Sequence, residues 1–168
     1  MNSLQQWDCC PEFIDTGDPI RSVRLLKRHD LYAIRGSISQ QPAGEVEMRL
    51  AGDDISILRG TPPPTVATDV ELLPVYSTAS NATPAVATTR IFLRLENDTP
   101  IDSVRSDIEA LDLRVDEIPA YAPHSAWLEP KSGRVDDALS KLDILRALPR
   151  VANVEPQLLR PRSLKSSP

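Results

Sequence analysis

Proline restricts the folding of this chain more than any other residue, because 16 prolines are spread over its 168 residues. Each proline fixes its own φ angle and lacks a backbone N–H, so it ends helices and is confined to the edges or ends of strands. Three consecutive prolines in "TPPPT" (61–65) disfavour any central strand there. The sequence therefore predicts many short elements joined by stiff connectors.

The overall composition predicts a folded protein and argues against two classes of partner. A hydrophobic fraction of 40% supports a core, and the scarcity of aromatics means that Leu, Val, Ile and Ala must build it. The net charge is −5 and no basic cluster precedes the C-terminal tail, which argues against a nucleic-acid partner. No apolar run approaches the ~20 residues of a membrane span, and the N-terminus does not resemble a signal peptide.

The residues that could carry chemistry are few. Cys9 and Cys10 are adjacent, so they cannot form a distributed disulfide framework, and with His29 and His124 they make no convincing metal site. His124 precedes Ser125, but neighbours on an extended strand point to opposite faces, which argues against a catalytic triad. We therefore predict no enzyme activity, no cofactor and no metal. Reduced thiols fit a cytoplasmic chain, and secretion stays open if the chain belongs to a longer precursor.

The N-terminal half predicts a small β-rich region at residues 21–76, after an irregular stretch at residues 1–20. Within it "EVEMRL" (45–50) alternates apolar and charged side chains, which indicates a half-buried strand, and "ISILRG" (55–60) returns after a turn. Together with "SVRLL" and "LYAIRG" these segments predict a meander of some four strands. Pro74 interrupts "VELLPVYS", which favours an edge strand. Residues 77–88 are small and polar, and they predict a linker.

Residues 89–160 have a sharper pattern. "RIFLRL" indicates a strand, and Pro100 marks the start of a helix whose apolar face recurs at intervals of three and four residues. After an extended segment and the strand "SAWLEP", a second amphipathic helix leads into the final strand "VANVEPQLL". The expected helix faces are Ile101, Val104, Ile108 and Leu111, then Val135, Ala138, Leu142 and Leu145. The order predicts an α+β protein with a ferredoxin-like βαββαβ domain that follows the β-rich region.

Residues 89–160 also resemble the propeptide domain of subtilisin-like serine proteases, a domain that occurs as a free-standing inhibitor as well. The resemblance rests on "RIFLRL", "IDSVRSDIEALDLRV", "SAWLEP" and above all "ALSKLDILRALPRVANVEPQLL". A β-rich extension before such a domain is found in several bacterial members. The Asp, His and Ser motifs of the protease body are absent from this chain.

The resemblance implies a binding mode. The sheet face docks on two surface helices of the protease, and the C-terminal tail lies in the active-site cleft as an added strand. Acidic residues at the sheet edge cap the N-termini of those helices, and the candidates are Asp116, Glu117 and Glu129. Leu164 is the candidate for the primary specificity pocket, with Lys165 as the alternative. The full set of expected cleft residues is Pro161, Arg162, Ser163, Leu164 and Lys165.

The predicted function is therefore to bind, inhibit and help fold a subtilisin-like serine protease encoded in the same precursor or by a neighbouring gene. The alternative is a non-inhibitory protein-interaction module that scaffolds an assembly. Under that alternative, residues 161–168 are a frayed end and the acidic residues are ordinary solvated charges.

Overall fold

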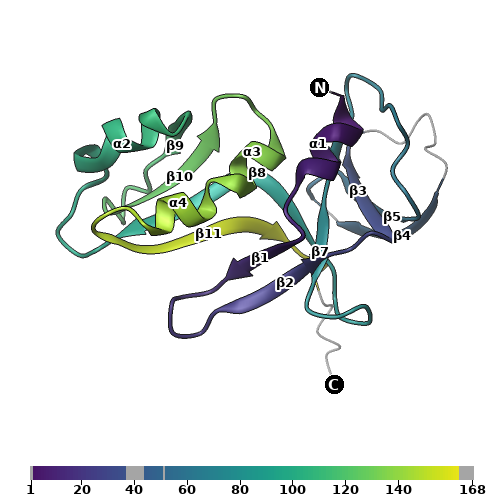
Figure 1. The fold of residues 1–168 in the computed structure, drawn as a ribbon, viewed down its shortest axis with the longest axis horizontal. Helices are drawn as coiled ribbons and strands as arrows, with labels where there is room; N and C mark the ends of the chain where they lie inside the picture. Colours follow the sequence, from purple (N-terminus) through teal and green to yellow (C-terminus); the bar gives the residue numbers. More distant parts are fainter. Residues whose placement is uncertain (1, 37–43, 51, 163–168) are drawn as a thin grey trace.

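The structure is a computed structural model that describes residues 2–36, 44–50 and 52–162. Strands hold 41% of the residues and helices 18%, so the protein is mostly β. The strands form two antiparallel sheets that lie side by side along the long axis of the molecule (Figure 1). The second sheet occupies one end, and helices pack against the first sheet.

The first sheet has seven strands and contains the centre of the fold. Its path runs β1–β2–β7–β8–β10–β9, and β11 pairs with β8 along the opposite edge of that strand. β8 is the longest strand, and its early residues pair with β7 while its later residues pair with β10. The strands are β1 (Phe13–Thr16), β2 (Val23–Lys27), β7 (Val75–Ser77), β8 (Ala85–Leu95), β9 (Leu113–Glu117), β10 (Ser125–Pro130) and β11 (Val151–Leu159).

The second sheet has four strands in the order β4–β5–β3–β6. Pro74 lies where the chain leaves this sheet, because β6 ends at Leu73 and β7 begins the next pairing at Val75 in the first sheet. Proline has no N–H to donate, so a change of sheet at this residue sacrifices no ladder hydrogen bond. The strands are β3 (Leu31–Arg35), β4 (Glu45–Leu50), β5 (Ile55–Arg59) and β6 (Glu71–Leu73).

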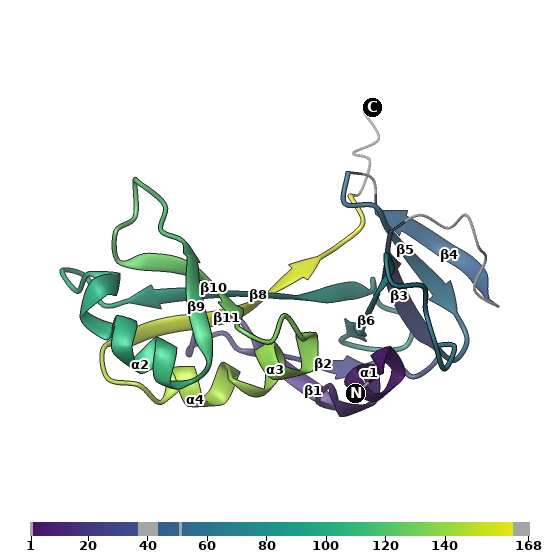
Figure 2. The ribbon, with the colours of Figure 1, turned by 90° about the horizontal axis from the view of Figure 1, so that it is seen from above.

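The helices are short, as the many prolines predict. Figure 2 shows α2, α3 and α4 on the same side of β8, β10 and β11, while α1 lies near the junction with the second sheet. The first predicted helix starts as a 3-10 helix, η1, and the second is divided at Lys141. The bounds are α1 (Ser3–Cys9), η1 (Ile101–Val104), α2 (Arg105–Ala110), α3 (Val135–Ser140) and α4 (Leu142–Arg146).

The predicted helix faces are confirmed. Ile101, Val104 and Ile108 are buried, and Leu111 is partly buried against the same core. The four residues expected on the second helix face, Val135, Ala138, Leu142 and Leu145, are also buried. They pack on the apolar side of β8, whose Ile91, Leu93 and Leu95 have no exposed surface. Local periodicity therefore identified the core side of each helix correctly.

The predicted fold class is wrong. Elements of residues 85–159 follow one another in the expected order, but they do not form a ferredoxin-like βαββαβ domain behind a separate β-rich region. β1, β2 and β7 continue the same sheet, so strands from both halves of the chain share one structure. The physical reason lies in β8, which starts at Ala85 instead of residue 90. Its residues Ala85–Thr88 are buried, and Val86 pairs with Val75 of β7 on one edge and with Leu159 of β11 on the other.

Three local expectations are corrected as well. Residues 1–20 are not irregular, because α1 and β1 lie within them. The second half of the expected linker at residues 77–88 is the start of β8, and its residues Ala85–Thr88 are buried, whereas residues 78–81 are exposed. β7 is not an edge strand, since it pairs with β2 and with β8, whereas β6 does lie at the edge of its sheet.

Candidate functional site

The first sheet has one face that the helices leave uncovered. Along β8, Ile91, Leu93 and Leu95 point to the helices, so Phe92 and its alternate neighbours point the other way. Trp127 of β10 and Glu155 of β11 lie directly opposite Phe92 in the two neighbouring strands. We call the surface formed by Arg90, Phe92, Trp127, Glu129 and Glu155 the open face.

An aromatic pair forms the centre of the open face. The ring centroids of Phe92 and Trp127 are 5.2 Å apart with their planes inclined by 59°, and both side chains are partly exposed. The guanidinium carbon of Arg90 lies 4.7 Å from the Trp127 ring centroid, which is a cation–π contact. Aromatic and arginine side chains at the centre of a surface are the residue types that dominate protein–protein binding energies.

The acidic residues predicted to cap helices of a partner are brought close to this cluster. Arg90 Nη2 lies 2.9 Å from Asp116 Oδ2 and 3.2 Å from Glu117 Oε2. Arg114 Nη2 donates to Glu129 Oε2 at 2.6 Å, and this bond raises the pKa of the Arg114 guanidinium. Of the three carboxylates Glu117 is the most exposed, with 58% of its side chain accessible. Glu117 is therefore the one best placed to reach a partner.

A groove of about 400 Å³ lies beside the aromatic pair. Phe92 and Trp127 line one side, and the last part of β11 lines the other, from Glu155 to Leu158. Thr16 and Arg160 complete the lining, so the groove runs toward the point where β11 ends. The groove has an aromatic wall with a few polar groups around it. Such a lining favours binding of a side chain from a partner over binding of a free charged ion.

The C-terminal segment leaves the sheet on the open side. β11 ends at Leu159, and in Figure 2 its last part rises away from the helices. Of the five residues expected in a protease cleft, Pro161 and Arg162 are described, with Pro161 partly buried and Arg162 exposed. Ser163, Leu164 and Lys165 lie outside the described residues. The structure thus directs the chain toward the open side up to Arg162.

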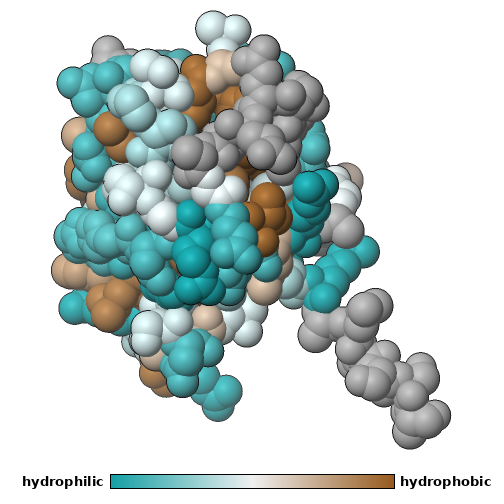
Figure 3. All heavy atoms as spheres, turned by 90° about the vertical axis from the view of Figure 1, so that its right-hand side faces the viewer, coloured by the Kyte–Doolittle hydropathy of each residue, from teal (hydrophilic) through white to brown (hydrophobic). Residues whose placement is uncertain are grey.

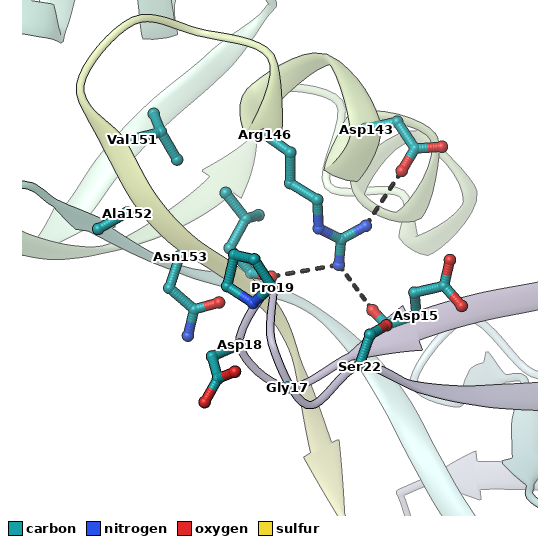
Figure 4. Close-up of a pocket in the computed structure, with 11 residues that line it drawn as sticks. Asp15, Gly17, Asp18, Pro19, Ser22, Asp143, Arg146, Val151, Ala152 and Asn153 are labelled. Atoms are coloured by element: carbon teal, nitrogen blue, oxygen red, sulfur yellow. Dashed lines mark hydrogen bonds and ion pairs between the residues drawn. The ribbon is translucent and has the colours of Figure 1, made fainter.

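A second hollow lies at the junction of β1, α4 and β11, with a volume of about 410 Å³ (Figure 4). Arg146 reaches across it and donates through Nη2 to the carbonyl oxygens of Asp15 at 2.6 Å and Val154 at 3.2 Å. Its Nη1 pairs with Asp143 at 3.0 Å. Among the described residues β1 pairs with β2 and β11 pairs with β8, so Arg146 links β1 to β11 through these carbonyls, and the hollow has a structural role.

Sequence reasoning missed Arg90, Phe92, Trp127 and Arg146. The sequence could have shown Arg90 and Phe92. In "RIFLRL" the apolar Ile91, Leu93 and Leu95 alternate with the other residues, so Phe92 and the two arginines must lie on the opposite face of the strand. Nothing local could have paired Phe92 with Trp127, which is 35 positions further along the chain. The role of Arg146 depends on β1, which was not predicted at all.

The cysteines and the residues around His124 do not form a catalytic or metal site among the described residues. Cys9 is exposed, while Cys10 is buried and its thiol donates to the Gln6 carbonyl at 3.2 Å. Asp116, which lies eight residues before His124 in the sequence, is paired with Arg90. Within residues 2–36, 44–50 and 52–162, no group of three or more His, Cys, Asp or Glu residues could hold a metal ion.

The molecular surface at the end formed by the second sheet differs from the open face. In Figure 3 the visible side chains there are mostly hydrophilic, and the hydrophobic ones occur in separate places.

None of the described helices is long and apolar enough to cross a membrane. Comparisons of the chain with protein-family models, curated proteins and solved structures found no match.

Proposed function

We propose that this protein binds and inhibits a subtilisin-like serine protease, with the open face docked on the protease surface. The residues that follow β11 then lie in the active-site cleft as an added strand. One observation carries the proposal: the open face and the end of β11 are on the same side of the first sheet, opposite the helices (Figure 2). A partner seated on the Phe92–Trp127 pair is therefore within reach of the C-terminal segment.

The energetics of the open face support a docking role. Phe92 and Trp127 are partly desolvated already, and a partner surface that covers both gains apolar burial at the centre of the interface. Charged pairs surround them, and such a polar rim contributes orientation more than affinity. Arg90 is ion-paired and stacked on Trp127, so little side-chain entropy remains to be lost on binding.

The C-terminal segment supplies the inhibitory part of the proposal. Residues 160–168 carry three positive charges and no negative one, and they have no apolar period. An extended segment of this kind binds through its backbone hydrogen bonds, with side chains in successive subsites. Leu164 is proposed for the primary specificity pocket, because an apolar side chain is favoured there over a charged one.

The test compares inhibition constants against a purified bacterial subtilisin. The full-length chain, a form that ends at Arg160, and the Leu164→Asp variant are measured, with binding followed separately by surface plasmon resonance. We expect the truncated form to bind weakly and the Leu164→Asp variant to inhibit poorly, because a carboxylate must be desolvated in an apolar pocket. Circular dichroism shows whether each form keeps its fold.

The possible outcomes separate the two functions. Equal inhibition by all three forms means that the C-terminal segment is a frayed end. If the forms bind the subtilisin and none of them inhibits it, the scaffold alternative is supported, in which the open face binds a partner and the C-terminal segment has no role. If the full-length chain neither binds nor inhibits the subtilisin, the proposal fails.

A further inference from the structure

A row of four side chains crosses the open face from strand to strand. Glu117 of β9 lies opposite Trp127 of β10. Phe92 of β8 lies opposite Trp127 on one side and opposite Glu155 of β11 on the other. The two aromatic rings are therefore placed between two carboxylates. Aromatic ring faces and carboxylates both attract cations, so the row has the composition of a site for a positively charged group.

The two carboxylates of this row differ in their surroundings. Glu117 Oε2 lies 3.2 Å from Arg90 Nη2, and the same guanidinium stacks on Trp127. At the other end of the row, the Asn153 amide donates to Glu155 Oε1 at 2.9 Å. No arginine, lysine or histidine in the described part of the chain forms an ion pair with Glu155. The row is thus balanced in charge at the Glu117 end and negative at the Glu155 end.

The groove of about 400 Å³ beside the aromatic pair provides an apolar approach to this carboxylate. Its apolar lining comes from Phe92, Trp127, Pro156 and Leu158, and Glu155 is part of the same lining. A ligand that fills the groove therefore needs an apolar stem and a cationic end. A lysine side chain has both, because its compact ammonium is carried on a flexible four-carbon stem.

We propose that the groove binds a lysine side chain of a partner protein, with the ammonium on Glu155 and the stem against Phe92 and Trp127. Arginine suits the site less well, since its guanidinium binds both oxygens of a carboxylate and Oε1 of Glu155 already accepts from Asn153. A quaternary ammonium group has no N–H to donate to Oε2. The inference goes beyond the proposed function, because it names the side chain that the groove recognises and does not depend on the class of the partner.

Arg160 lines the same groove and is the charge that opposes a cationic ligand. It follows the end of β11, five residues after Glu155, so the two backbones are roughly 15 Å apart along an extended chain. At this distance the positive charge of Arg160 weakens the binding of a cation only slightly. The two residues therefore predict opposite effects: loss of the Glu155 charge weakens lysine binding, and loss of the Arg160 charge does not.

The experiment is an NMR titration that follows the indole N–H signals of Trp7 and Trp127. The probe is Nα-acetyl-lysine N-methylamide, and its matched control is Nα-acetyl-norleucine N-methylamide, which lacks the ammonium. We expect the lysine probe to shift the Trp127 signal with a dissociation constant in the millimolar range. The norleucine probe should bind at least about fivefold more weakly. The Trp7 signal should not move, because Trp7 is 4% exposed and belongs to the other core cluster.

Four variants assign the contributions of single side chains. Glu155→Gln should weaken binding of the lysine probe by about fivefold or more, since it removes a charge-assisted hydrogen bond. Phe92→Leu keeps an apolar side chain without a ring and should weaken binding by about twofold to fivefold. Arg160→Gln should bind as tightly as the parent or up to about twofold tighter. Glu109→Gln is the control without effect, because Glu109 is exposed on α2, on the opposite side of the sheet (Figure 2). An unchanged Trp7 signal shows that each variant is folded.

The outcomes either support or overturn the lysine site. Absence of a Trp127 shift with the lysine probe, or equal binding of both probes, overturns it. Parent-like binding by Glu155→Gln overturns it as well, and so does weaker binding by Arg160→Gln. Choline chloride is titrated in parallel, and stronger binding of choline than of the lysine probe would assign the groove to a quaternary ammonium group instead. None of these readouts involves a protease, so the lysine site and the proposed function can fail independently.

Discussion

At the scale of single residues, buried polar side chains of β2 and β7 hold the N-terminal segment in place. Lys27 Nζ donates to the Trp7 carbonyl at 2.6 Å and to the Cys10 carbonyl at 3.4 Å, and it lies 4.1 Å from the Trp7 ring centroid. The Tyr76 hydroxyl donates to the Pro11 carbonyl at 2.7 Å. Carbonyls at the end of α1 attract a cation, so they stabilise the buried ammonium of Lys27.

The same region predicts a loss of stability in alkali. Burial raises the pKa of the Cys10 thiol from 9.0 to about 12, and burial also raises the pKa of the Tyr76 hydroxyl. The unfolded chain therefore loses these protons at lower pH than the folded chain does. The contribution to the free energy of unfolding is complete below about pH 9 and decreases as the pH rises toward about 12. We expect the urea midpoint to fall over this range.

Two cysteine variants provide the comparison for the alkaline prediction. Cys10→Ala removes the buried thiol and should make the decline of the urea midpoint with pH shallower. Cys9→Ala should leave the pH dependence unchanged, because Cys9 is exposed. Identical profiles for the two variants would show that Cys10 does not keep its proton in the folded protein.

At the scale of elements, the second predicted helix is two short helices with one continuous buried side. α3 ends at Ser140 and α4 begins at Leu142, with Lys141 between them at φ −90° and ψ −10°. Leu142 is 3% exposed while its neighbour Ile144 is 47% exposed, so the burial pattern continues across the break. The break changes the direction of the helix without moving the apolar side off the sheet.

This arrangement predicts unequal effects of two similar substitutions in α4. Leu142→Ala should reduce the free energy of unfolding by about 2–4 kcal/mol, because Leu142 is buried in the larger core and its removal leaves a cavity between α4 and β11. Ile144→Ala should change it by less than about 0.5 kcal/mol, since that side chain is already half in solvent. Urea denaturation followed by circular dichroism measures both. A larger effect for Ile144→Ala would mean that α4 presents its other side to the core.

At the scale of the whole molecule, the N-terminal segment joins the cores of the two sheets, and β8 joins the two halves of the chain. Trp7 packs in the smaller core cluster with Tyr32 and Leu72 of the second sheet, while Cys10 belongs to the larger core of the first sheet. Helix α1 therefore contacts both cores within a few residues. β8 connects the two halves of the chain within the first sheet, since it pairs with β7 as well as with β10 and β11.

This connection predicts that residues 89–160 do not fold alone. The cut removes the buried start of β8 together with β1, β2 and β7, which exposes the apolar side of the sheet. The dispersed amide signals of a folded protein should be absent from the NMR spectrum of this fragment. A fragment of residues 1–162 is the control and should give the dispersed spectrum. A folded 89–160 fragment would show that the C-terminal half is an independent domain.

The candidate site was predictable only in part. The sequence located Asp116, Glu117 and Glu129 on the extended segments that flank the open face, but it treated them as free carboxylates. The structure pairs the first two with Arg90 and the third with Arg114, so each carboxylate already has an arginine partner. The Phe92–Trp127 pair was not predicted, because it depends on the register between β8 and β10.

Local periodicity alone determined the helix faces and the strands β10 and β11, because side-chain spacing along a helix or strand is set by the chain's own geometry. Strand partners follow a different rule, since they are chosen by contacts between residues far apart in sequence. Small residues such as Ala85–Thr88 look like a linker by composition, yet they are buried at the start of β8 between β7 and β11. The tertiary structure alone therefore decided that β1, β2 and β7 extend the sheet of β8, and with it the fold class of the protein.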